Sequence, residues 1–182
     1  MTKSAAVLLL AYIAALYVID ANAGPGLAHA VWPRDVDRLP GAVTGAFLHA
    51  DQAHLAGNIV GVGILGGIAA TRGAAYLGAV LTAGVVAGGG LLWAIGDHGT
   101  PVIGASGVVF ALLGAYIVAT VLTFPNEYWI SKSLSLLVCG AIAVSGLVPR
   151  DGVSWEGHLG GLIAGVICAA VYFAVKTIEE NR

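Results

Sequence analysis

The sequence predicts an all-α, polytopic membrane protein built as a bundle of six transmembrane helices. Of its 182 residues, 58% are hydrophobic and only 10% are charged, and the mean hydropathy is +0.90. Ten acidic and eight basic residues are too few to cover the surface of a soluble domain of this size. The apolar residues fall into six runs, and each run approaches the ~20 residues that cross a ~30 Å hydrocarbon layer.

The six predicted spans are joined by short breaks everywhere except after the first. They cover residues 5–20, 52–70, 74–95, 105–124, 133–149 and 157–176. Glycine, proline and polar residues mark the short breaks, at 71–73, 96–101, 125–127 and 149–152. The connection 21–51 is long and mixes charged residues with Leu, Val and Trp, so we expect it to lie partly in the membrane interface.

The first span also fits a second interpretation, as a signal peptide. Lys3 precedes the apolar run and the small residues 21–23 follow it, in the order that a cleavable signal shows. The run is long enough to contribute a span, so we interpret it as a retained helix. We therefore expect residues 1–182 to form a single six-helix transmembrane domain.

An even number of spans places both termini on the same side of the membrane. If that side is the cytoplasm, it carries five of the eight basic residues, in line with the positive-inside bias. The inner set is Lys3, Arg72, Lys132, Lys176 and Arg182, and the outer set is Arg34, Arg38 and Arg150. The second, fourth and sixth spans then begin at the outer surface, where they carry His54, Ser106 and His158.

Ser106 lies on a glycine-flanked turn at the head of the fourth span. Pro101 and Gly104 end the preceding segment, so the serine falls at an N-cap or in a first turn. Free backbone N–H groups there favour a developing oxyanion, and Gly104 and Gly107 would let a substrate carbonyl approach the backbone. The same position also fits an ordinary capping serine, which is common at helix starts.

His158 begins the sixth span. A histidine at the head of an apolar helix is costly unless it is paired or faces water. In a partly dry site its neutral form is favoured, and a general base needs that form. Glu156 is only two residues away and lies on a different helix face, so we expect a Ser–His dyad rather than a triad. The alternative is an interfacial histidine whose tip reaches the lipid headgroups.

The second span carries a further polar pair. His54 and Asn58 are four residues apart and share a helix face, one turn beyond Asp51, which is a candidate N-cap. A neutral histidine and an amide in this arrangement suit oxyanion donors, and His49 lies before the helix, where it can orient its neighbours. Three histidines could also bind a metal, but no further ligand set accompanies them and no HExxH pattern occurs, so we expect none.

Three motifs resemble the signatures of the rhomboid intramembrane serine proteases, in their order and in their internal spacing. They are His49-x4-His54-x3-Asn58, Gly104-x-Ser106-Gly107, and Gly157-His158-x2-Gly161-x3-Gly165. The resemblance covers essentially the whole chain, as a minimal six-helix form with no appended soluble domain. It implies that residues 1–182 are one protease domain.

The resemblance also implies a role for each motif residue. Ser106 would attack the peptide carbonyl and His158 would transfer the proton, while His54, Asn58 and the Ser106 N–H would hold the oxyanion. Gly161 and Gly165 would let the sixth span pack on the fourth. The chain departs from the family where a tyrosine commonly stacks on the histidine: here Phe110 stands, which keeps the stacking without the hydroxyl.

The resulting expectation is an intramembrane endopeptidase without a cofactor, acting on transmembrane proteins near the outer ends of their spans. We expect it in the plasma membrane of a prokaryote, with cytoplasmic termini, an active site that opens to the outside, and no nucleic-acid partner. Two alternatives remain: a non-catalytic relative that binds and escorts membrane segments, and a small transporter or channel. The apolar inner halves of the spans disfavour a transporter, and retention of both serine and histidine disfavours an escort.

Overall fold

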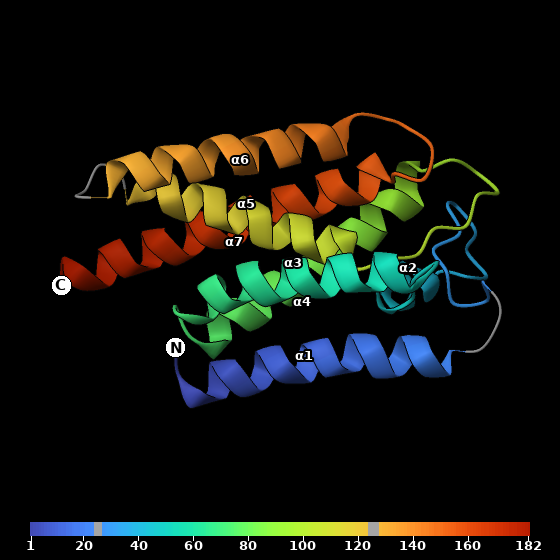
Figure 1. Cartoon of the computed structure of the whole chain (residues 1–182), viewed down its shortest axis with the longest axis horizontal. Coiled ribbons are helices and arrows are strands. Elements are labelled where there is room, and N and C mark those ends of the chain that lie inside the picture. The colour runs from blue at the N-terminus through green and yellow to red at the C-terminus, as the bar shows by residue number, and fades with distance from the viewer. Residues whose placement is uncertain (24–26, 124–127) are drawn as a thin grey trace.

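The computed structural model describes residues 1–23, 27–123 and 128–182 and is a bundle of long helices (Figure 1). The helices are α1 (Lys3–Asn22), α2 (Gly41–Thr44), the 3-10 turn η1 (Gly45–Phe47), α3 (Gln52–Ala70), α4 (Ala74–Ile95), α5 (Ser106–Leu122), α6 (Trp129–Leu147) and α7 (Trp155–Glu180). The predicted break at 125–127 and the last residue of the predicted span 105–124 lie outside the described residues.

The ends of the helices follow capping and turn chemistry more closely than hydropathy. α3 and α4 have the bounds of the spans predicted at 52–70 and 74–95. α1 starts two residues before the predicted 5–20, because the Thr2 hydroxyl caps it by accepting the Ala5 N–H. α6 begins before the predicted 133–149 and ends at Leu147, because Val148 precedes a proline and is extended.

The last helix is longer than the predicted span 157–176 at both ends. Ser154 caps its start by accepting the Gly157 N–H, so α7 begins at Trp155. At the other end, α7 continues through a polar turn in which the Lys176 Nζ lies 3.8 Å from the Glu180 Oε1. Hydropathy does not predict this turn, because its residues are polar. α5 starts at Ser106, one residue later than the predicted 105.

Residues 27–51, the described part of the connection between α1 and α3, contain more regular structure than the sequence predicts. They include α2 and η1, neither of which was predicted. Val31 and Val102 exchange two backbone hydrogen bonds of 2.9 Å, which tie this connection to the loop before α5. The Trp93 indole on α4 donates to the Asp35 carbonyl at 3.0 Å. The connection is therefore fixed to the end of the bundle where α5 and α7 begin.

α5 and α7 pack against each other inside the bundle, with α4 beside both (Figure 1). The main core lies between α1, α3, α4 and α5, and a smaller cluster of Phe110, Leu113 and Ala143 joins α5 to α6. α6 is peripheral, since only Ala143 and Gly146 of its residues are buried. Large apolar side chains such as Leu10, Ile64 and Leu137 point outward. An exposed apolar belt of this kind fits a lipid environment.

The helix lengths fit a membrane-spanning bundle. In the described part of the chain, five helices are long and apolar enough to cross a bilayer, namely α1, α3, α4, α6 and α7. α5 is shorter, at 17 residues, yet a helix of that length reaches ~26 Å at 1.5 Å per residue. Both termini lie at the same end of the bundle (Figure 1). The chain is an all-helical integral membrane protein, and its organisation as one six-span domain stays a prediction.

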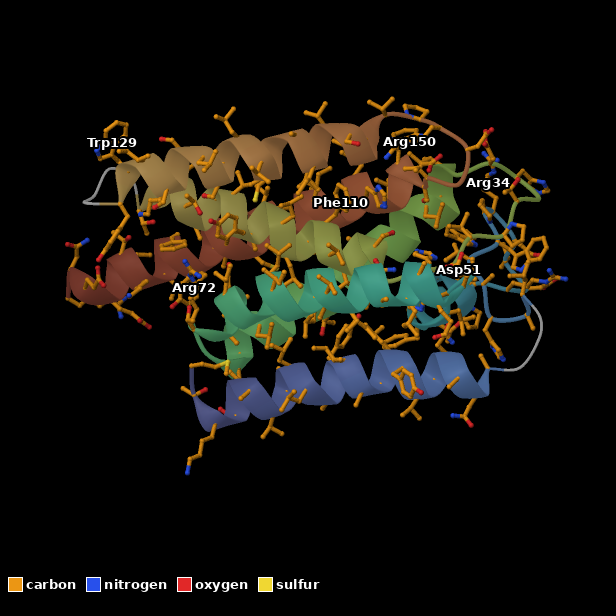
Figure 2. The ribbon with its side chains drawn as sticks, viewed as in Figure 1. Arg34, Asp51, Arg72, Phe110, Trp129 and Arg150 are labelled. Atoms are coloured by element: carbon orange, nitrogen blue, oxygen red, sulfur yellow. The ribbon has the colours of Figure 1, made fainter. Side chains whose placement is uncertain are left out.

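The charged side chains labelled in Figure 2 lie at the two ends of the bundle. Arg72 and Trp129 lie at the end that holds the termini, and Arg34, Asp51 and Arg150 lie at the opposite end. Phe110 lies between the helices, near that opposite end. The motif residues belong to the opposite end as well, because they sit at the starts of α3, α5 and α7.

Candidate active site

Ser106 is the first residue of α5. The N-cap is Ala105, and no side chain caps this helix. In the residues that the structure describes, the Ser106 hydroxyl makes no hydrogen bond to protein. The interpretation of Ser106 as an ordinary capping serine is therefore wrong, and its hydroxyl is free for another role.

The loop before Ser106, here called the serine loop (residues 101–105), is held by backbone hydrogen bonds. The Gly104 N–H donates to the Gly45 carbonyl at 2.9 Å, and the Ala105 N–H donates to the His49 Nε2 at 3.4 Å. Gly104 has a φ of +136°, which favours glycine. A Cβ there would lie 2.7 Å from the His54 ring, so a side chain would also clash.

His158 lies in the first turn of α7 and is buried. Its Nδ1 lies 2.8 Å from the Gly146 carbonyl on α6. A carbonyl can only accept, so Nδ1 carries the proton and Nε2 keeps a free lone pair. The Phe110 ring stacks on the imidazole, with centroids 4.0 Å apart and planes 1° apart. The histidine is thus fixed in position and in tautomer without an acidic partner.

Close packing of α7 on α5 brings His158 to the level of Ser106. The Cα of Gly161 lies against the Gly107 carbonyl, and that of Gly165 lies against the Ala111 carbonyl one turn further. A Cβ at either glycine would overlap those carbonyls. Small residues at four-residue intervals allow this approach of two backbones.

Asn58 and His54 face the serine loop from α3. Asn58 is buried, and its Nδ2 has no hydrogen-bond partner within the described residues. A buried amide without a protein partner is costly, so the Asn58 N–H groups are available to an acceptor in the cavity. The Asp51 carboxylate caps α3 by accepting the His54 N–H at 2.8 Å, as the sequence predicts.

His49 lies beneath the serine loop, with its side chain fully buried. Its ring is 5.0 Å from that of His54, edge to face. Burial, together with the neighbouring His54, lowers the pKa of His49 below its ordinary value and keeps the ring neutral. Its contact with the Ala105 N–H requires an unprotonated Nε2, so the neutral ring carries its proton on Nδ1.

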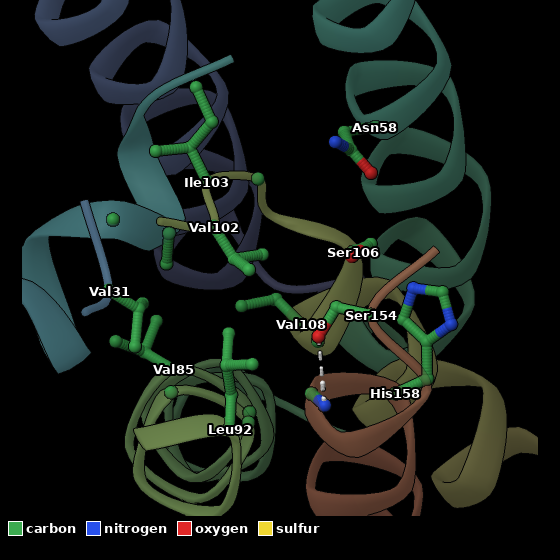
Figure 3. A pocket seen from close by; sticks show the side chains of 18 of the residues that line it. Val31, Asn58, Val85, Leu92, Val102, Ile103, Ser106, Val108, Ser154 and His158 are labelled. Carbon is green, nitrogen blue, oxygen red and sulfur yellow. Dashed lines mark hydrogen bonds between the residues drawn. The ribbon is translucent and has the colours of Figure 1, made fainter. Parts of the chain in front are cut away.

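One cavity of about 230 Å³ is lined by motif residues of α3, α5 and α7 (Figure 3), but His49 is not part of its lining. Its polar lining consists of His54, Asn58, Ser106, Ser154 and His158. A wider cavity of about 640 Å³ adjoins it and shares His54 and Ser154 with it. In the described residues no hydrogen bond joins Ser106 to His158. Such contacts are often long in free enzymes and shorten only with substrate present.

Two groups that position the site histidines were not predicted from the sequence. The Gly146 carbonyl orients His158, but a backbone carbonyl leaves no trace in a sequence. Asp20, near the end of α1, accepts the His49 backbone N–H at 2.6 Å. A lone acid in an apolar run was the available signal for Asp20, because such residues are rare within spans and need a partner.

Across residues 1–23, 27–123 and 128–182, no three His, Cys, Asp or Glu side chains come together as ligands. His49 and His54 pack edge to face, and the His158 Nδ1 is engaged with a carbonyl. The arrangement suits acyl transfer, with a hydroxyl, a base and unpaired N–H donors around one cavity.

Comparison with known proteins identifies the family. The Rhomboid domain matches residues 37–175, which include every motif residue above. The chain belongs to the rhomboid family. An uncharacterized protein of Mycobacterium tuberculosis is 32% identical to this rhomboid over 176 residues, which cover 88% of the chain and 72% of the relative.

Two further relatives carry rhomboid names. Rhomboid-related protein 3 of Homo sapiens is 30% identical over 144 residues, covering 71% of this rhomboid but 35% of the human protein. Rhomboid-like protease 5 of Toxoplasma gondii is 32% identical over 101 residues, which cover 52% of this chain and 11% of the relative. The similarity thus lies in the helical domain, and both relatives are much longer than the matched segment.

Proposed function

We propose that this rhomboid is an intramembrane serine endopeptidase that hydrolyses peptide bonds in or near transmembrane segments with a Ser106–His158 dyad. One observation carries the proposal: Ser106, His158 and the unpaired amide of Asn58 come from α5, α7 and α3 yet line a single cavity. Polar groups brought together in an apolar bundle need a functional reason. Membership of the rhomboid family supports the same activity.

The first step is acylation of the serine. The Ser106 Oγ attacks the carbonyl carbon of the scissile peptide, and its proton passes to the His158 Nε2, whose lone pair is free. The tetrahedral intermediate then collapses, and His158 returns the proton to the leaving amine. The peptide C–N bond breaks, and the N-terminal half of the substrate stays as an ester on Ser106.

The oxyanion of the intermediate needs donors that are already in place. The Asn58 Nδ2 supplies unpaired N–H groups, and the Ser106 N–H, at the start of α5, has no partner within its own helix. His54 lies against Gly104 and lines the same cavity. We assign these three donors to the oxyanion, in which role a single donor is worth about 10²–10³ in rate.

Hydrolysis of the ester repeats the chemistry with water. His158 takes a proton from a water molecule, the hydroxide attacks the acyl carbon, and Ser106 leaves with the proton that His158 returns. The Gly146 carbonyl and the Phe110 ring hold the imidazole through both steps, where a triad would use an acid. Water reaches the serine through the wider outer cavity.

Substrates and location follow from the same arrangement. We assign transmembrane proteins as substrates, because the cavity lies inside a bundle with helices that are long and apolar enough to cross a membrane. The termini are cytoplasmic and the active site opens to the outside of a prokaryotic plasma membrane, as the distribution of basic residues favours. No cofactor takes part in the reaction written above.

Cleavage of a transmembrane reporter protein by purified enzyme in lipid tests the proposal. We expect Ser106→Ala and His158→Ala to lower cleavage by more than about 10³-fold. Ser145→Ala and His98→Ala are matched controls, because they change an exposed serine and an exposed histidine outside the cavity. Wild-type protein that binds the reporter without cutting it would instead indicate an escort. Cleavage that persists in Ser106→Ala would refute the dyad.

A further inference from the structure

Asp20 is an unusual residue for its surroundings. It lies in the last turn of α1, an otherwise apolar helix whose other charged residue is Lys3 at the opposite end. Its side chain is only 20% exposed. A carboxylate so placed is costly unless it is paired, and its partners come from the segment before α3 rather than from its own helix.

The Asp20 carboxylate contacts two atoms of His49, the backbone nitrogen and the ring Nδ1. The Asp20 Oδ1 accepts the His49 backbone N–H at 2.6 Å and lies 3.4 Å from the His49 Nδ1. The Nδ1 atom is buried and makes no hydrogen bond in the described residues, so its contact with the Asp20 carboxylate at 3.4 Å is electrostatic. On the far side of the ring, Nε2 accepts the Ala105 N–H at 3.4 Å. The imidazole therefore lies between a carboxylate and the last residue of the serine loop.

This geometry requires one tautomer of His49. Nε2 can accept from Ala105 only if the proton is on Nδ1, and Nδ1 then faces the Asp20 carboxylate. If the proton moved to Nε2, two N–H donors would face each other and the Ala105 N–H would lose its partner. A negative charge beside Nδ1 favours the proton on that nitrogen.

We propose that Asp20 is a positioning residue for the serine loop, acting through the tautomer and orientation of His49. Ala105 is the N-cap of α5 and directly precedes Ser106, so a shift of Ala105 moves both the nucleophile and its N–H. Misplacement of reacting groups by about 1 Å costs about 10²-fold in rate. This inference rests on the proposed function, because the readout is the reactivity of Ser106.

A fluorophosphonate probe reacts with an activated serine. It distinguishes a role of Asp20 in positioning the serine loop from a role in merely holding α1 to the segment before α3. The final labelled fraction counts competent molecules, whereas the labelling rate constant reports the geometry in each of them. For Asp20→Asn and Asp20→Ala, we expect the labelled fraction to stay unchanged and the labelling rate constant to fall by about 10- to 100-fold. In cleavage of the reporter, kcat should fall by the same factor, while KM stays within about twofold of wild type. Asn22→Ala should match wild type, because in the described part of the chain the Asn22 amide bonds the Val18 carbonyl of its own helix.

Asp20→Asn keeps the size of the side chain and an oxygen for the His49 backbone N–H, so it is the variant that tests the charge. A lowered labelled fraction with a wild-type rate constant would overturn the inference and leave Asp20 as a tether. A wild-type rate constant in both variants would overturn it as well. Asp20→Glu should recover part of the rate if its carboxylate reaches Nδ1.

Nitrogen NMR of the histidine rings provides a readout that does not depend on catalysis. With ¹⁵N-labelled histidine, and with the His49 signals identified by their loss in His49→Gln, we expect the proton on Nδ1 in wild type and a shift toward Nε2 in Asp20→Asn. An unchanged tautomer would overturn the inference while leaving the proposed function intact. If wild type shows the expected tautomer but never labels or cleaves, the proposed function fails instead.

Discussion

Gly146 combines two requirements of the histidine at one residue. Its carbonyl accepts the His158 Nδ1–H, and its missing side chain leaves room for the Phe110 ring that stacks on the same imidazole. A Cβ at Gly146 would overlap the edge of the Phe110 ring and lie 3.1 Å from the His158 Nδ1. The position of the base thus depends on a residue that has no side chain of its own.

Gly146→Ala should therefore lower catalysis by displacing Phe110. We expect kcat to fall by about 10- to 100-fold, since small misplacements of a catalytic group are costly. Gly140→Ala is the matched control, because Gly140 lies on the same helix and a Cβ there meets nothing within 4 Å. Kinetics of both variants on one transmembrane reporter would decide. Equal activity in the two variants would contradict this role of Gly146.

The site residues that could be predicted from the sequence are those with polar side chains in apolar segments. Ser106, His158 and Asn58 stand out because polar residues in apolar runs are rare, and the structure places all three on one cavity. The Gly146 carbonyl could not be predicted, since nothing marks which backbone group meets a side chain twelve residues away. Asp20 carried a signal, but only the fold brings it to His49.

At the scale of helices, the contact between α5 and α7 sets the distance between nucleophile and base. Two glycines of α7 lie against backbone carbonyls of α5 one turn apart, and His158 lies one turn above the first of them. Helices in lipid associate through close packing, because burial from water contributes little there. The separation of Ser106 and His158 thus depends on residues deeper in the bundle.

Gly165→Ala tests this contact at a distance from the chemistry. Its Cβ would overlap the Ala111 carbonyl, so we expect α7 to move away from α5. Overpacking of this kind costs about 1–3 kcal/mol, which should lower the thermal midpoint as well as the activity. The matched control is Gly63→Ala on α3, where a Cβ meets nothing within 4 Å. A thermal midpoint and an activity equal to those of the control would show that the contact tolerates a methyl group.

Hydropathy predicted the apolar middles of the helices better than their ends. α3 and α4 have the predicted bounds because polar or turn residues flank them directly. α7 extends past its predicted end, since an ion pair of Lys176 and Glu180 supports a polar helical turn. α2 and η1 were missed because each is a single short turn. Such turns depend on tertiary contacts more than on local sequence pattern.

At the scale of the whole molecule, the bundle is polarised. Both termini lie at one end (Figure 1), and the cavity is lined by Ser106 and His158 at the starts of α5 and α7, toward the other end. The loop between α4 and α5 lies at the cavity end, because it leads into Ser106. The orientation of the bundle in the membrane therefore decides on which side the active site opens.

Thiol labelling of intact cells tests the proposed orientation. In a background of Cys139→Ala and Cys168→Ala, we expect Asp97→Cys to react with a membrane-impermeant maleimide in intact prokaryotic cells. Arg182→Cys, at the end with the termini, should react only after lysis. The opposite pattern would place the active site on the cytoplasmic side.

Identification of the covalently modified residue shows whether Ser106 is an activated nucleophile. After reaction of wild-type protein with a fluorophosphonate probe, peptide mass spectrometry should find one adduct, on the peptide that contains Ser106. His158→Ala should lose that adduct while remaining folded, because the serine has then lost its base. An adduct on another residue, or reporter cleavage without any adduct on Ser106, would show that Ser106 is not the nucleophile.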